Sequence, residues 1–107
     1  MEEILITEIG NEWALSIPKT LSEKDLLQLL SEKINGLIQS DFNSLLTILY
    51  RIDIDEKKLK ATLQQNPDRD AGLLIAEMVL SRQKQKLATR KQFRADQHKK
   101  NDGEEKW

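Results

Sequence analysis

The chain has 107 residues, of which 38% are hydrophobic and 33% are charged, and its formal net charge is −1. This length allows one domain with a single modest core, and the composition is not that of a disordered chain. The absence of cysteine excludes disulfides and thiolate metal sites. Residues 1–81 carry eight Lys or Arg against fourteen Asp or Glu, whereas residues 82–100 carry eight against one, a balance of +7. The sequence therefore predicts an acidic body followed by a basic arm, residues 82–100.

The N-terminal segment, residues 1–18, is predicted to form a β-hairpin. Its first half, residues 4–9, can be divided into two alternating sets of side chains, and Gly10-Asn11 follows as a two-residue loop. Glycine at the first loop position is typical of a type II′ turn between paired strands. In this register Trp13 lies on the apolar face of the hairpin and anchors it to the rest of the protein.

Residues 22–87 are expected to form a helical core. Apolar residues recur there every three or four positions, which is the spacing of a helix face that packs on its neighbours. Asn66-Pro67 ends one of these helices, because the residue before proline disfavours the α conformation. Candidate N-caps of the helices are Ser22, Ser40 or Asp41, Asp55, and either Asp68 or Asp70.

The number of helices between residues 22 and 52 remains open at this point. The apolar phase continues through Ser40-Asp41 without a jump, so one long kinked helix fits the pattern, although the candidate cap favours two helices. In either case the apolar stripe that follows is expected to be core. Tyr50 and Arg51, on its flanks, are candidate rim contacts of an interface. The stripe consists of Phe42, Leu45, Leu46, Leu49 and Ile52.

These patterns predict a mainly α fold, with an N-terminal β-hairpin followed by a small bundle of three to four helices, of which the last is a long basic C-terminal helix. Residues 1–100 are expected to form a single domain, and 101–107 a disordered tail. The apolar stripe of the last helix thins beyond Leu87. The basic arm should therefore leave the body, and its charges should be freer of structural duties than those elsewhere.

The segment from Ile34 to Phe93 resembles a family of small uncharacterised helical proteins found in Bacteroidetes. The resemblance is carried by the stretches Leu49–Asp53 and Asn66–Gly72, and the segment covers a little over half of the chain. It implies a helical, non-secreted bacterial protein. The family has no established function, so the resemblance assigns no catalytic residue, cofactor or partner.

Signals for catalysis or metal binding are sparse. The single histidine, His98, stands beside lysines in the basic arm, and no glycine-rich phosphate loop occurs. One acidic segment has the spacing of a twelve-residue calcium loop, but Ala71 stands where that loop needs glycine, so a helix start is the favoured interpretation. We therefore expect no enzyme, metal or cofactor. The four residues with calcium-loop spacing are Asn66, Asp68, Asp70 and Glu77.

The basic arm is the candidate partner-binding site. Its cations could meet phosphates and release counterions, but they surround the helix rather than forming one stripe, and Phe93 is its only aromatic residue. Cations also favour a helix C-terminus, so a solvated arm, or an arm docked on the acidic body, remains an alternative. The candidate residues are Arg82, Lys84, Lys86, Arg90, Lys91, Arg94, Lys99 and Lys100.

These observations favour a small non-catalytic protein-protein interaction or assembly module that docks through helix faces and the basic arm, with a protein partner or a second copy. The alternative is a nucleic-acid-binding accessory protein that uses residues 82–100. No membrane partner and no small-molecule substrate are expected. An acidic N-terminus without a secretory signal, and the lack of a long apolar run, favour a cytoplasmic location.

Overall fold

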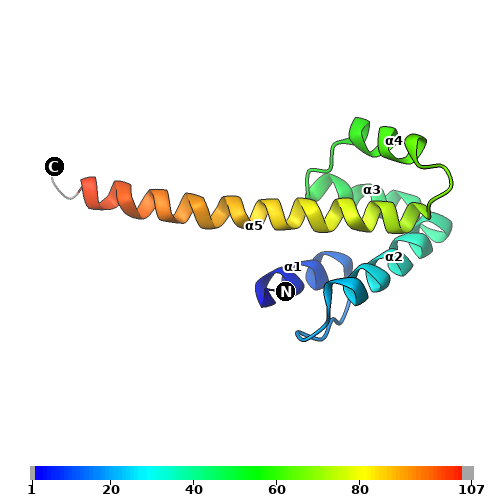
Figure 1. The fold of residues 1–107 in the computed structure, drawn as a ribbon, viewed down its shortest axis with the longest axis horizontal. Coiled ribbons are helices and arrows are strands. Elements are labelled where there is room, and N and C mark those ends of the chain that lie inside the picture. Colours follow the sequence, from blue (N-terminus) through cyan, green and yellow to red (C-terminus); the bar gives the residue numbers. More distant parts are fainter. Residues whose placement is uncertain (1, 105–107) are drawn as a thin grey trace.

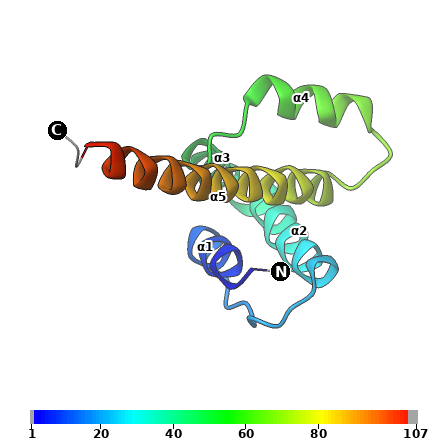
Figure 2. The ribbon, with the colours of Figure 1, turned by 60° about the vertical axis from the view of Figure 1, so that its left-hand side comes forward.

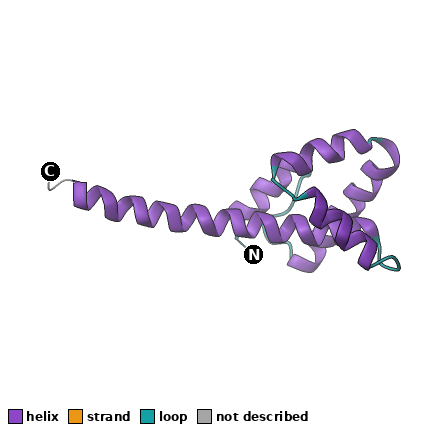
Figure 3. Cartoon of the chain, turned by 90° about the horizontal axis from the view of Figure 1, so that it is seen from above, coloured by secondary structure: helices purple, strands orange, loops and turns teal. Residues whose placement is uncertain are grey.

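The computed structural model describes the backbone of residues 2–104 and the side chains of residues 2–92. The described chain is helical and contains no strand (Figure 3). The mainly α architecture agrees with the sequence. In chain order the helices are α1 (Glu3–Trp13), α2 (Glu23–Ser40), α3 (Phe42–Arg51), α4 (Glu56–Gln65) and α5 (Ala71–Glu104).

The predicted N-terminal β-hairpin is wrong, because the same residues form helix α1. Leu5, Ile9 and Trp13 follow each other at intervals of four, and all three are buried in the core. That spacing places them on one helix face, which packs on α5 within the shared core. Burial of this face on the other helices explains why helix prevails over the local alternation that favoured strands.

Gly10, predicted as a hairpin turn, lies inside α1 and allows the chain to close that helix. The chain turns back beyond Trp13, and the Leu15 N–H donates to the Gly10 carbonyl at 2.9 Å. A Cβ on Gly10 would lie 2.8 Å from the Leu15 carbonyl oxygen, which is too close for ordinary packing. Ala14 takes the left-handed conformation, at φ 54°, that commonly ends helices.

The region between residues 22 and 52 forms two helices, as the candidate cap favoured. Asp41 has φ −156° and ψ 71°, which breaks the helical path, and its carboxylate accepts from the Ser44 N–H at 3.2 Å. The caps predicted at Ser22 and Asp55 are also confirmed, because their side chains accept from backbone N–H groups in the first turns of α2 and α4.

Helix α5 forms the axis of the molecule, with α1 and α2 on one side and α4 on the other (Figures 1 and 2). Its main interface is with α2. The core lies around the first half of α5, and the predicted stripe residue Leu87 is its last described apolar member on that helix. Trp13 is fully buried in this core, as expected of an anchor, but it lies on helix α1 and not on the predicted strand.

Two features differ from a simple bundle. Phe42, expected in the core, is 53% exposed. Helix α5 continues well beyond the other helices (Figure 1), and the molecule measures 58 × 32 × 22 Å. Of the expected tail, residues 101–104 form the last turn of α5, and 105–107 lie outside the described residues.

Candidate interaction surface

The first half of the basic arm is part of the fold. Gln83 and Leu87 of α5 are 5% and 6% exposed, so this stretch packs on the body. Arg82, on the same stretch, donates from Nε to the Ile52 carbonyl at 3.1 Å, and its guanidinium lies 3.8 Å from the Asp53 carboxylate. It thereby ties α5 to the turn that follows α3.

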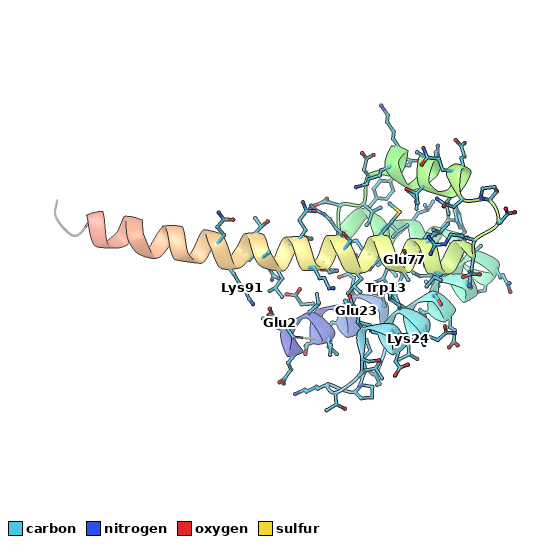
Figure 4. The ribbon with its side chains drawn as sticks, viewed as in Figure 1. Glu2, Trp13, Glu23, Lys24, Glu77 and Lys91 are labelled. Carbon is cyan, nitrogen blue, oxygen red and sulfur yellow. The ribbon has the colours of Figure 1, made fainter. Side chains whose placement is uncertain are left out.

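Three further cations of the arm pair with acids of the first two helices. Lys84 bonds to Glu23 at the start of α2, and Arg90 bonds to Glu8 of α1. Lys91 lies 2.5 Å from the carboxylate of Glu2 at the start of α1, on the side of α5 that faces α1 (Figure 4). The acidic body and the basic arm recognised in the sequence therefore meet inside one molecule.

The remaining candidate cations have different places. Lys86 lines an open depression of about 460 Å³ between α1 and α5, together with Glu8, Glu12 and Arg51. One carboxylate oxygen of Glu12 is buried there without a hydrogen-bond partner, 3.7 Å from the Arg51 guanidinium. Arg94, Lys99 and Lys100 lie in the part of α5 for which side chains are not described.

A depression of about 560 Å³ lies between α4 and α5. It holds opposite charges that already meet: Arg69 lies 2.5 Å from Glu77, and Arg82 faces Asp53. Among the described side chains, no group of three or more His, Cys, Asp or Glu is placed to hold a metal ion. The charged side chains named here are paired with each other, and they do not form a convergent set of reactive groups.

The segment with calcium-loop spacing contains the cap of α5. Asp70 accepts from the Leu73 N–H at 2.9 Å, as a helix cap does. Its carboxylate also accepts from Asn35 Nδ2 of α2, at 2.9 and 3.2 Å, and Asn35 Oδ1 accepts from the Gly72 N–H at 3.1 Å. We call this arrangement the Asn35 bridge. The Asn35 amide, with the Leu73 N–H adding to it, lowers the pKa of Asp70.

A second surface was missed by the sequence interpretation, which assigned Phe42 and Leu46 to the core. Phe42 is 53% and Tyr50 64% exposed, and Leu46 between them is half-buried. A signal was available in the sequence, because no charged residue occurs between Asp41 and Arg51 in a chain that is 33% charged. Tyr50 is exposed, and Arg51 lies 3.7 Å from Glu12 of α1. Their role as rim contacts of an interface stays a prediction.

Comparisons with family models, with curated proteins and with solved structures gave no match. Within the described residues, no helix is both long enough and apolar enough to span a membrane.

Proposed function

We propose that this protein is a small non-catalytic module that binds another protein through the end of α5. The proposal is carried by the division of α5 into two parts. The part that ends at Lys91 is packed on the body and ion-paired to it, whereas residues 93–104 continue as a helix past α1–α4 (Figure 1). A partner could bind this continuation of α5 without displacing any contact of the core.

Helix stability supports this assignment. Most helical stability in proteins comes from packing of an apolar face. Residues 93–104 continue α5 and contain Phe93 as their only large apolar residue. A partner surface would add packing contacts to this segment.

The charge of this segment favours a protein over a polyanion. Residues 93–104 hold three cations, Arg94, Lys99 and Lys100, which are balanced by three acids. Four of the five cations between residues 82 and 91 are engaged with acids of the same chain. Phosphates would have to displace those acids, which weakens the case for nucleic acid. A partner surface of mixed charge fits better, with electrostatics mainly affecting encounter rate.

The test compares two baits, the full chain and a chain that ends at Gln92. The shorter bait keeps the buried residues Gln83 and Leu87 and the ion pairs up to Lys91. Its urea unfolding midpoint should therefore equal that of the full chain. We expect a protein from nuclease-treated lysate of the source organism to bind the full chain and not the shorter one. Identical protein recovery with both baits would contradict the proposal.

Nucleic acid is examined with the same two chains. Fluorescence anisotropy with a labelled duplex and a labelled single strand, across a salt series, measures binding to phosphates. A steep loss of affinity with salt, carried by the full chain, would replace the protein partner with the nucleic-acid alternative. The Bacteroidetes resemblance and a cytoplasmic location remain expectations that accompany the proposal.

A further inference from the structure

Helix α3 presents an exposed face without charge. Phe42, Leu46 and Tyr50 are spaced by four residues, so they form one stripe along the helix. Asn43 and Thr47 are exposed beside this stripe, and both are uncharged. In a chain where one residue in three is charged, a helix face of this length without a charge departs clearly from the rest of the surface.

The stripe borders a small apolar depression between α3 and α4. Leu46, Leu49 and Tyr50 of α3 line it together with Ile54, Glu56 and Leu59. The Tyr50 hydroxyl donates toward the Glu56 carboxylate at 3.5 Å. Phe42 and Tyr50 are the two ends of the stripe, and Leu46 lies between them.

We propose that this face binds the same face of a second copy of the chain. Charged residues are depleted at the centre of protein interfaces and aromatic residues are enriched there, as in this stripe. A partner with a charged face would lose hydration without gaining an ion pair on α3. A second copy offers an uncharged face of matching length, and a net charge of −1 adds little repulsion between two copies.

The spacing of the stripe fixes the arrangement of the pair. Phe42 and Tyr50 each lie four residues from Leu46, so a two-fold axis at Leu46 makes the face self-complementary. In the antiparallel pair, Phe42 faces the partner's Tyr50 at both ends, and Leu46 faces the partner's Leu46. Aromatic rings opposed in this way add a favourable contact to the burial of their apolar area.

The face is small, which sets the strength of the pair. A helix of ten residues is about 15 Å long, and its exposed side falls short of the roughly 800 Å² that each partner buries in a standard interface. The dimer is therefore weak and depends on protein concentration. It is also independent of the end of α5, so a chain that ends at Gln92 should still dimerise if the function proposed above fails.

Sedimentation velocity over a range of concentrations tests the pair. We expect the full chain to shift from monomer toward dimer as its concentration rises, and Tyr50→Glu or Phe42→Glu to remove this shift. Ile4→Glu is the matched control, because Ile4 is a 45% exposed apolar residue on α1. A monomer at the highest concentration, or an equal loss with Ile4→Glu, would overturn the proposal.

Single-cysteine variants test the arrangement, because the chain has no cysteine of its own. With a short bis-maleimide, Leu46→Cys should cross-link to itself. A mixture of Phe42→Cys and Tyr50→Cys should give several-fold more cross-linked dimer than either variant alone. Preferential self-linking of Phe42→Cys and of Tyr50→Cys would refute the antiparallel pair. The same variants in a chain that ends at Gln92 should behave alike, which separates this interface from the end of α5.

Discussion

Replacing Gly72 by alanine should destabilise the protein, although alanine favours helix. Gly72 is the second residue of α5 and is buried against α2. An alanine Cβ there would lie 2.5 Å from Asn35 Nδ2, closer than packed atoms approach. Asn35 would have to move, and its three hydrogen bonds to Asp70 and the Gly72 N–H would be lost.

The two opposing effects have different sizes. Three hydrogen bonds at about 0.5–1.5 kcal/mol each contribute roughly 1.5–4.5 kcal/mol, and alanine in place of helical glycine returns about 1 kcal/mol. The net expectation is a loss of about 0.5–3.5 kcal/mol in the free energy of unfolding, since the hydrogen-bond term is larger. For a domain of this size each kcal/mol lost corresponds to a fall in Tm of about 4–8 °C.

Urea unfolding followed by far-UV circular dichroism measures this loss. Gly36→Ala is the matched control, because Gly36 is a helical glycine of α2 with nothing within 4 Å of an added Cβ. That control should gain about 0.5–1 kcal/mol from helix propensity alone. In an Asn35→Ala background, Gly72→Ala should no longer destabilise, because the colliding amide is absent. If Gly72→Ala raised the midpoint as Gly36→Ala does, the Asn35 bridge would carry no stability.

Three further changes test other parts of the structure. Ala14→Gly should add about 1 kcal/mol of stability, because Ala14 has φ 54°, and an unchanged urea midpoint would contradict this. The Asp70 carboxylate stabilises the fold above its unfolded pKa of about 3.9, and this stabilisation is lost as pH falls through its folded pKa, which the Asn35 amide lowers. Asp70→Asn should therefore flatten the acid side of the curve of stability against pH. A curve as steep as that of the unchanged chain would refute this role of Asp70. Glu8→Lys, opposite Arg90, should lower the free energy of unfolding by about 0.2–1 kcal/mol at low salt, and by less at high salt. A loss of stability that does not depend on salt would point to packing instead of the ion pair.

The helix boundaries could be predicted because their signals are local. Asp41 and Asp55 each bond to a backbone N–H two or three residues ahead, so their effect is contained within one turn of chain. The same applies to Ser22. Between α2 and α3 the apolar phase gave no sign of a break, and the cap alone located it. Such short-range bonds depend little on the rest of the fold.

Helix α1 could not be predicted from its own residues. Residues 4–9 are apolar on both sides of an alternating pattern, and Gly10-Asn11 has the composition of a tight turn. The choice depends on burial of Leu5, Ile9 and Trp13 against helices that lie far away in the chain. The exposure of Phe42 has the same origin, because it depends on where the other helices lie and not on the residues of α3 alone.

The charge division takes on a different meaning once its members are located. Lys84, Arg90 and Lys91 pair with Glu23, Glu8 and Glu2, so these cations are engaged with the acidic body, and two of them link α5 to α1. The two surfaces proposed for binding, residues 93–104 and the exposed face of α3, are both close to neutral. Salt screens exposed charge pairs and leaves apolar burial largely unaffected. Added salt should therefore loosen α1 more than it weakens either proposed interface, which reverses the dependence expected of a basic arm that binds its partner by charge.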